Sequence, residues 1–348
     1  MHRGGTLVQP TLAYETWGEL NADRSNAVLI FTGLSPSAHA TSSPADPSPG
    51  WWEEVIGPGR AIDTRRYFVI CVNSLGSCFG STGASSIDPL TGEPYRLSFP
   101  VLSLEDVARG AREVVRYLQI ERLNTVLGPS MGGMSGLAFE IMFPGISDGL
   151  VIISSGSRSL PFATALRSLQ REMIRCDPNW QSGNYGAETM PIVGMRLARK
   201  LGMITYRSAE EWRVRFGRER ASEESDSNDP FCLDFEIEAY LEHNSNKFIG
   251  QFDPNCYLYL SRASDLFDIA DHGATIEAGL AKIDVNRAMI IGVETDCLFP
   301  LYQQEELAEQ LSIPGREFEY VALESIQGHD SFLVDMDRFR PTIARFFD

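Results

Sequence analysis

The sequence predicts an α/β fold in which a mostly parallel sheet is covered by helices on both faces. Short, almost wholly apolar runs alternate with stretches whose apolar residues recur at helical spacing. Such runs are typical of strands buried on both sides, and their alternation with helices predicts strand–helix–strand units. The chain has 348 residues, 43% of them hydrophobic, which suffices for one large domain or one domain with a big insertion.

The first half of the chain shows this alternation clearly. Ala27–Leu34 and Tyr67–Leu75 are apolar runs that predict buried strands. Leu104–Leu118 has apolar residues at helical spacing and predicts a helix. A short strand is expected at Thr125–Leu127, because the run stops at a glycine. Helical spacing resumes over Met131–Phe143, which completes a strand–helix unit.

The C-terminal part of the chain repeats the pattern. Strands are predicted at Gly149–Ser155, Ala288–Thr295 and Phe318–Ser325, each an apolar run of strand length. A helix is expected over Tyr302–Leu311. The closing stretch Ser331–Phe347 predicts a helix with a disturbance at Pro341, which cannot donate a helical hydrogen bond.

The alternation breaks between two of these strands. The segment from Arg158 to roughly Lys282 is long, polar and helix-prone, far longer than ordinary strand–helix units need. Within it, SEESDSNDPF predicts an exposed loop. We therefore expect a core formed by residues 1–157 and 283–348, with residues 158–282 inserted as a mainly helical lid.

Charge and cysteine content narrow the class of protein. The formal net charge of −17 argues against nucleic acid or an anionic membrane as the main partner, and no apolar run approaches the ~20 residues of a membrane span. Residues 158–220 nevertheless hold twelve Lys and Arg against six Asp and Glu, typical of either a solvated helical surface or a site for an anionic ligand. The six cysteines form no CxxC pair, which predicts a reduced, cytoplasmic protein.

The segment GPSMG, from Gly128 to Gly132, places a serine between a predicted strand and a predicted helix. It fits the G-x-S-x-G pattern, in which a sharp turn exposes a nucleophilic serine above a helix N-terminus. Glycines remove side chains where strand and helix crowd together. The same segment also fits an N-cap serine in a glycine-rich turn. Ser130 is therefore a candidate nucleophile.

A serine nucleophile needs a base and an acid that orients the base. In this kind of fold the partners follow in the order serine, acid, histidine, each after a later strand. Of the five histidines, only His329 lies just past the last predicted strand. Asp296 follows the preceding strand, and Glu294 competes with it from within that strand. Order and position thus predict Ser130, Asp296 and His329 as a catalytic triad.

The developing oxyanion of acyl transfer needs two backbone N–H donors. One donor should be Met131, directly after the nucleophile, and the other should come from the loop after an early strand. FTGLSPSAHA follows such a strand, which makes Leu34 the candidate for the second donor.

Several longer motifs resemble the homoserine O-acetyltransferase family of acyltransferases, which has the α/β-hydrolase fold. These motifs are GWWEEVIGPGRAIDTRRYFVIC, NSLGSCFGSTG, GPSMGGM, DPNW…GNY, LARKLGMITYRS, DCLFP and GHDSFLVD, and the resemblance extends over nearly the whole chain. The resemblance implies an acyl-CoA co-substrate and an amino-acid acceptor. It places the catalytic roles on the same triad and implies that Arg199 and Asp330 bind the amino acid. It also implies a homodimer.

One segment departs from many homoserine enzymes. Where those have HALTG, this chain has TGLSPSAH, and the run RSLQREMIR accompanies it. Both features are similar to the branch of L-serine O-succinyltransferases that serve cysteine synthesis. Gly33, Leu34, Ser35 and Pro36 could shorten the pocket to favour L-serine over L-homoserine. One methylene supports only ~1–3 kcal/mol of discrimination, so both acceptors stay open here.

The acyl donor is expected to be succinyl-CoA, with acetyl-CoA as the alternative. A buried succinyl carboxylate requires a cation. Arg167, Arg171 and Arg175 are spaced by four and share one helical face. Arg167 is the first candidate for acyl specificity and Arg175 the second, whereas a solvated basic stripe would explain all three. A serine esterase would use the same triad, and neither reaction requires a metal or another cofactor.

Overall fold

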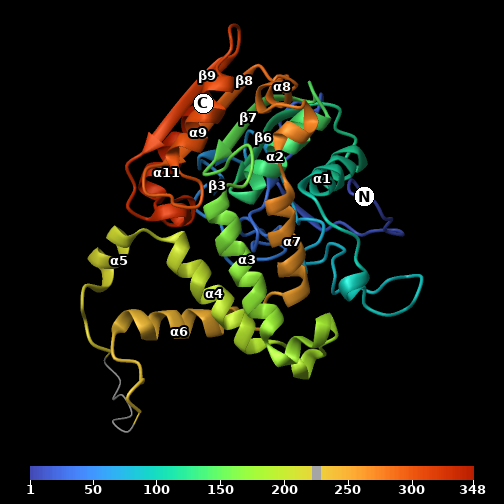
Figure 1. Cartoon of the computed structure of the whole chain (residues 1–348). Coiled ribbons are helices and arrows are strands. Elements are labelled where there is room, and N and C mark those ends of the chain that lie inside the picture. The colour runs from blue at the N-terminus through green and yellow to red at the C-terminus, as the bar shows by residue number, and fades with distance from the viewer. Residues whose placement is uncertain (222–228) are drawn as a thin grey trace.

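The computed structural model describes residues 1–221 and 229–348 (Figure 1). Its centre is a seven-stranded sheet with the strand order β1-β5-β2-β6-β7-β8-β9, and every neighbouring pair is parallel except β1 with β5. The predicted α/β class with a mostly parallel sheet is therefore confirmed. The strands are β1 (Tyr14–Trp17), β2 (Ala27–Phe31), β5 (Phe68–Val72), β6 (Leu123–Pro129), β7 (Ser147–Ile153), β8 (Arg287–Val293) and β9 (Glu317–Leu323).

Helices bury both faces of the sheet, and successive side chains of a strand point to opposite faces. In β2, Leu29 belongs to one apolar cluster and its neighbour Ile30 belongs to the other. All five residues of β2 are buried, which explains why the strand is a continuous apolar run. The Leu29 cluster contains residues of α1 (Leu104–Tyr117), α2 (Met131–Met142) and α9 (Leu301–Leu311), and the Ile30 cluster contains residues of α11 (Met336–Phe347).

Some elements differ from the sequence prediction. The antiparallel edge strand β1 was not predicted, nor was the two-stranded sheet of β3 (Ile56–Gly57) and β4 (Ile62–Asp63). The expected disturbance of the closing helix at Pro341 is wrong, because Pro341 lies inside α11. The break comes at Asp335, which has non-helical dihedrals of φ −99° and ψ 61°. It separates α11 from the short helix α10 (Ser331–Val334).

The segment expected to form a lid consists mainly of helices in the residues that the structure describes. Ser222–Phe231, where a loop was expected, lies largely outside the described residues. Buried residues of α7 (Pro254–Leu266) belong to the same apolar cluster as Leu29 of β2, so this helix packs against the core. The longer helices are α3 (Pro161–Cys176), α4 (Ile192–Tyr206), α5 (Ala209–Phe216), α6 (Glu236–Phe248) and α7 (Pro254–Leu266), followed by the short α8 (Ile276–Leu280).

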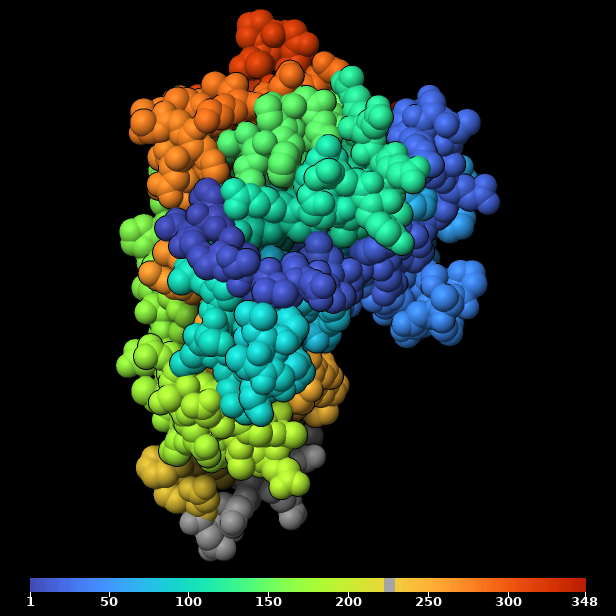
Figure 2. Space-filling model, turned by 90° about the vertical axis from the view of Figure 1, so that its right-hand side faces the viewer, coloured from blue at the N-terminus to red at the C-terminus, as the bar shows by residue number. Residues whose placement is uncertain are grey.

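The helical segment projects beyond the carboxyl ends of the parallel strands (Figure 1). Figure 2 shows the N-terminal residues crossing one face as a band below α1, with the loop that precedes α1 between this band and the helical segment. No helix within the described residues is long and apolar enough to cross a membrane. The loops at the carboxyl ends of β2, β6, β8 and β9 meet between the sheet and the helical segment (Figure 1), which is where ligands bind in open α/β sheets.

Candidate active site

The corner between β6 and α2 holds Ser130 in a strained conformation. Ser130 has φ 56° and ψ −125°, and its N–H donates to the carbonyl of Ile153 across 2.9 Å. A Cβ on Gly128 would lie 2.2 Å from the carbonyl oxygen of Gly132, and a Cβ on Gly132 would lie 2.4 Å from that of Phe31. Only glycine fits at these two positions, which is the physical reason for the G-x-S-x-G spacing.

The structure brings the three residues of the expected triad together. His329 Nε2 lies 2.7 Å from Ser130 Oγ, and His329 Nδ1 lies 2.7 Å from Asp296 Oδ2. The other carboxylate oxygen of Asp296 accepts the N–H groups of Leu298 and Phe299 at 2.9 and 3.0 Å. Both oxygens of the acid are therefore held, and one of them orients the imidazole.

The competing acid does not reach the histidine. Glu294 is exposed, whereas Asp296 is 3% exposed and hydrogen-bonded to His329. β8 ends at Val293, so Asp296 lies in the loop beyond the strand, where the N–H groups of Leu298 and Phe299 hold its carboxylate towards His329. The geometry thus agrees with the choice of Asp296 over Glu294 that order and position predicted.

The environment of His329 favours a basic imidazole. Burial lowers the pKa of His329, but the charge of Asp296 and its hydrogen bond to the imidazole outweigh burial, so the pKa is raised. Three aromatic rings surround the imidazole at centroid distances of 5.5 to 5.9 Å: Phe299, Phe332 and Tyr206. These rings limit the access of water to the histidine.

Leu34 and Met131 lie on neighbouring loops at one edge of the sheet, because β2 pairs with β6. Met131 is the first residue of α2, and such N–H groups have no partner within their own helix. Neither backbone N–H donates to another group among the residues that the structure describes. Both amides are thus free to donate to an oxyanion next to Ser130, and Leu34 and Met131 both line the cavity at Ser130.

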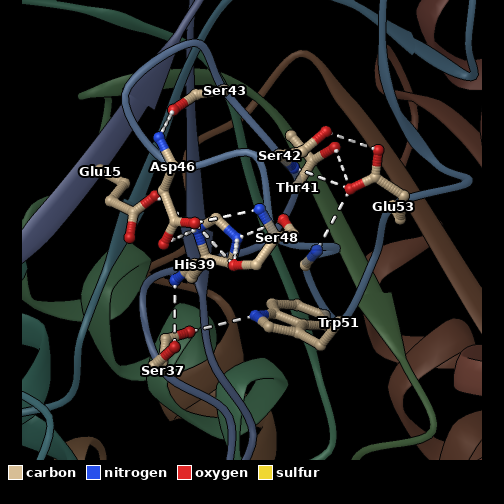
Figure 3. A network of polar contacts seen from close by, with 11 residues as sticks. Glu15, Ser37, His39, Thr41, Ser42, Ser43, Asp46, Ser48, Trp51 and Glu53 are labelled. Atoms are coloured by element: carbon tan, nitrogen blue, oxygen red, sulfur yellow. Dashed lines mark hydrogen bonds and ion pairs between the residues drawn. The ribbon is translucent and has the colours of Figure 1, made fainter.

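The loop after β2 that carries Leu34 is held by a polar network, shown in Figure 3. His39 Nδ1 lies 2.9 Å from Glu15 Oε2 on β1. Burial raises the pKa of Glu53, but hydrogen bonds from the loop outweigh it and lower the pKa to about 2. The indole N–H of Trp51 donates to the carbonyl of Ser37 at 3.0 Å, and the ring of Trp51 borders the cavity at Ser130. This network fixes one wall of the cavity.

The cavity at Ser130 is narrow, about 80 Å³, and Arg167 of α3 borders it. Arg167 Nε lies 2.7 Å from Asp265 Oδ1, and its Nη2 donates to Ser159 Oγ at 2.6 Å. Its third nitrogen, Nη1, makes no hydrogen bond within the described part of the chain. Arg167 is therefore the one arginine on the described lining of this cavity, and its Nη1 remains able to donate a hydrogen bond. The four residues expected to set acceptor specificity, Gly33, Leu34, Ser35 and Pro36, also line this cavity.

Arg199 and Asp330 line a second cavity of about 250 Å³. The guanidinium of Arg199 lies 4.6 Å from the ring centre of Phe248, and its buried Nε has no hydrogen-bond partner among the described residues. Asp330 Oδ2 lies 3.3 Å from Arg207 Nε. Burial raises the pKa of Asp330 and outweighs the charges of Arg207 and His329, which lower it. Asp330 borders both cavities and therefore links them.

Arg175 is not brought to the cavity at Ser130. It is exposed, its guanidinium lies 5.5 Å from the ring centre of Trp180, and it borders a third cavity. Arg167 and Arg175 share one face of α3, but they are about two helical turns apart. Of the two, only Arg167 borders the cavity at Ser130. The structure therefore separates the two arginines that were considered together for acyl specificity.

Sequence reasoning missed Tyr206, which borders the cavity at Ser130 and lies close to both substrate-binding candidates. Burial raises the pKa of Tyr206, the charge of Asp330 raises it further, and the charges of Arg199 and Arg167 lower it. A signal was present in the sequence. Tyr206 follows Arg199 by seven residues, or two helical turns, so both lie on one face of α4.

The comparisons with known proteins agree with this geometry. A family model described as alpha/beta hydrolase fold matches residues 26–335. The chain belongs to the alpha/beta hydrolase fold family. Among solved structures of this fold, homoserine O-acetyltransferase from Bacillus anthracis superposes with a TM-score of 0.89 at 30% identity, covering 97% of this chain and 92% of that one. Esterase E22 gives a TM-score of 0.87 at 29% identity, covering 97% and 94%.

Relatives within the alpha/beta hydrolase fold family are more similar in sequence. Serine O-succinyltransferase of Litchfieldella anticariensis is 56% identical, over 99% of this chain and 95% of that protein. The protein of the same description from Stenotrophomonas maltophilia is also 56% identical, over 99% and 94%. The resemblance to the acyltransferases of the homoserine O-acetyltransferase family is thereby confirmed. The chain is an enzyme, an acyltransferase with the alpha/beta hydrolase fold.

Proposed function

We propose that the enzyme transfers a succinyl group from succinyl-CoA to the hydroxyl group of L-serine, in cysteine biosynthesis. The observation that carries this proposal is the 2.7 Å spacing of Ser130 Oγ from His329 Nε2, in a cavity that also presents the free Nη1 of Arg167. The 56% identity to serine O-succinyltransferases supports the choice of donor and acceptor.

In the first half-reaction, His329 Nε2 takes the proton of Ser130 as Oγ attacks the thioester carbonyl. The N–H groups of Leu34 and Met131 stabilise the oxyanion of the tetrahedral intermediate. The carbon–sulfur bond then breaks, and the CoA thiolate leaves with the proton from His329. Asp296 orients the imidazole and stabilises its cation throughout. The product is a succinyl ester on Ser130.

In the second half-reaction, the amino acid binds with its carboxylate at Arg199 and its ammonium at Asp330. A guanidinium suits a carboxylate, and a carboxylate suits an ammonium group. Its hydroxyl gives a proton to His329 and attacks the acyl-enzyme carbonyl, and Ser130 leaves with that proton. No step requires a metal or another cofactor, so the acyl-CoA is the only co-substrate in this scheme.

The test of the proposed function is a matrix of two acceptors and two donors. L-Serine and L-homoserine are each assayed with succinyl-CoA and acetyl-CoA, and kcat/KM is measured by thiol release. We expect L-serine with succinyl-CoA to give the highest value. A preference for acetyl-CoA, or for L-homoserine with either donor, would overturn the assignment of that substrate.

Two alternative functions have support of their own. A homoserine O-acetyltransferase or O-succinyltransferase in methionine biosynthesis is favoured by the structural match to the Bacillus anthracis enzyme. An esterase is favoured by the match to esterase E22. Thiol release that is equally fast with and without an amino acid would identify a hydrolase. Release that depends on the amino acid would identify a transferase.

Arg167→Leu should lower kcat/KM for succinyl-CoA by ~10–100-fold, the scale of one lost charge-assisted hydrogen bond. The reason is that a succinyl carboxylate in the narrow cavity would lose its cation, whereas an acetyl group needs none. kcat/KM for acetyl-CoA should hold or improve. Both donors are measured with L-serine at saturation.

Arg171→Leu is the matched control for this variant. Arg171 Nη2 lies 2.7 Å from Asp265 Oδ2, so its loss leaves Asp265 with one arginine, as the loss of Arg167 does. Arg171 does not line the cavity at Ser130, and its loss should affect both donors alike. If Arg167→Leu also lowers kcat/KM equally for both donors, Arg167 does not recognise the acyl carboxylate.

Arg199→Ala should weaken use of the amino acid and spare formation of the acyl-enzyme. The α-carboxylate would lose its partner, while Ser130 and its base are untouched. Single-turnover release of CoA without amino acid measures the first step, and the KM for L-serine measures the second. Arg196→Ala, which removes an arginine of the same helix that pairs with Glu242, is the control. If Arg199→Ala also abolishes the single-turnover release of CoA, Arg199 acts in binding the acyl donor or in maintaining the fold.

Assembly and location complete the proposal. Apolar side chains of α3 and α4 are exposed, among them Leu169, Val193, Leu197 and Ile204. Exposed apolar residues along two neighbouring helices are typical of a helix-packed interface, so we propose a homodimer formed through this surface. A cytoplasmic location follows from the proposed use of acyl-CoA, which is a cytoplasmic metabolite.

A further inference from the structure

The third cavity, of about 730 Å³, lies at the C-terminal end of α3, where this helix runs beside α7 (Figure 1). Three arginines line it, Arg171, Arg175 and Arg262, and Glu172 is the one acidic residue on its described wall. The whole chain has a formal charge of −17. Positive charge concentrated in a concave site of an acidic protein favours an anionic ligand.

Two of these arginines are available to bind a ligand. Arg171 is occupied, because its Nη2 pairs with Asp265 and its Nη1 donates to Ser261 Oγ at 2.9 Å. Arg175 and Arg262 are exposed, and neither forms an ion pair with another of the residues that the structure describes. Guanidinium groups pair bidentately with phosphates, so two free arginines on one cavity fit a ligand with more than one phosphate.

The cavity also has aromatic walls that are held in place. The guanidinium of Arg175 lies 5.5 Å from the ring centre of Trp180. The indole N–H of Trp180 donates to Asn255 Oδ1 at 3.0 Å, and the hydroxyl of Tyr259 donates to the carbonyl of Phe99 at 2.7 Å. Each ring is anchored by its polar end and offers its apolar surface to the cavity. Fixed aromatic rings next to arginines form a platform for a nucleobase.

One helix borders both this cavity and the cavity at Ser130. Arg167 borders one cavity and Arg175 the other, and the two are eight residues apart, which is about 12 Å along an α-helix. The pantetheine arm of CoA, when extended, is longer than this. The arm is therefore long enough to span the separation of the two cavities along α3, with the thioester at Ser130 and the phosphates at the third cavity.

We propose that this cavity binds the phosphorylated adenosine of acyl-CoA, with Arg175 and Arg262 pairing its phosphates and Trp180 and Tyr259 flanking its adenine. The inference rests on the proposed function only in naming acyl-CoA as the donor. Free adenine nucleotides share the same chemistry, so the experiment compares the two sources. Arg175 then contributes to binding of the donor without touching its acyl group.

The first experiment measures binding in the Ser130→Ala enzyme, which keeps the cavity and cannot form an acyl-enzyme. Isothermal titration with 3′-phosphoadenosine 5′-phosphate, the nucleotide end of CoA, and with ATP reports the two affinities. We expect the CoA fragment to bind more tightly. Adding Arg175→Ala and Arg262→Ala should weaken its binding by ~10–100-fold. This result does not depend on which reaction the triad catalyses, so it separates failure of this inference from failure of the proposed function.

The second experiment is kinetic, with Ser130 intact. Arg175→Ala combined with Arg262→Ala should raise the KM for succinyl-CoA by ~10–100-fold. Release of p-nitrophenol from p-nitrophenyl acetate, a donor without a nucleotide, should be unchanged. Arg116→Ala with Arg122→Ala removes the same charge from exposed sites outside the cavity and is the control.

Three outcomes would overturn the inference. The CoA fragment could bind the arginine variants as tightly as the parent enzyme. Arg116→Ala with Arg122→Ala could raise the KM for succinyl-CoA as much as Arg175→Ala with Arg262→Ala does, which would show a general charge effect. ATP could bind more tightly than the CoA fragment while the KM for succinyl-CoA stays unchanged, which would make the cavity a site for a free nucleotide.

Discussion

Ser130→Ala is expected to reduce acyl transfer by about 10⁶-fold, the loss seen when the nucleophile is removed from a Ser-His-Asp enzyme. In the proposed mechanism Ser130 Oγ forms the acyl-enzyme, and among the described residues it is the one hydroxyl within hydrogen-bond distance of His329 Nε2, at 2.7 Å. Thiol release from succinyl-CoA measures the rate, and intact mass measures the succinylated enzyme. A fluorophosphonate probe should label the wild type and not the variant.

The fold should survive this substitution. Ser130 is held by its backbone, whose N–H donates to Ile153 and whose carbonyl accepts from Ser155 Oγ at 2.8 Å, and alanine keeps both contacts. Ser135→Ala, one turn further along α2, is the matched control and should keep its activity. Near-wild-type transfer by Ser130→Ala, in a preparation free of wild-type enzyme, would remove the triad from the mechanism.

Asp296→Asn is expected to lower kcat by ~10⁴-fold, because the amide favours the wrong tautomer of His329. It should also change the pH profile. Asp296 raises the pKa of His329, and only the neutral imidazole acts as a base, so wild-type activity falls as pH drops through this raised pKa. Without the carboxylate the pKa of His329 is lower, and the acid limb of kcat/KM should move to lower pH.

Glu294→Gln is the control for this acid. Glu294 is exposed and two residues away, so its loss should change kcat less than tenfold. A loss below tenfold for Asp296→Asn, together with a large loss for Glu294→Gln, would show that the acid had been assigned wrongly. An unshifted acid limb in Asp296→Asn would show that Asp296 does not set the basicity of His329.

Much of the core could be predicted because its signals are local. A strand buried on both faces must be apolar, as all of β2 and the second half of β7 are, and this leaves a run that stands out in the sequence. The elbow could be predicted for a similar reason. A Cβ on Gly128 or Gly132 would clash with a backbone carbonyl, so the spacing of the motif follows from a steric constraint.

Other elements left no such signal. β1 is only four residues long and partly exposed at the sheet edge, where apolar patterning is weak. Pro341 was expected to disturb the last helix, yet the break comes at Asp335, whose side chain accepts from Ser325 Oγ at 2.6 Å. That contact joins residues ten apart, and nothing in the local sequence indicates it.

The sequence by itself predicted the class of fold, the candidate nucleophile and the order of the expected triad, because each prediction depends on short-range sterics or on the order of strands along the chain. Only the tertiary structure showed that Asp296 and not Glu294 contacts His329, and that Arg167 and not Arg175 borders the cavity at Ser130. Within each pair the residues have similar chemistry and lie on the same element or directly beyond it. Which of them reaches a site depends on side-chain direction and on how α3 packs over the sheet, and both are set by contacts between residues far apart in the chain.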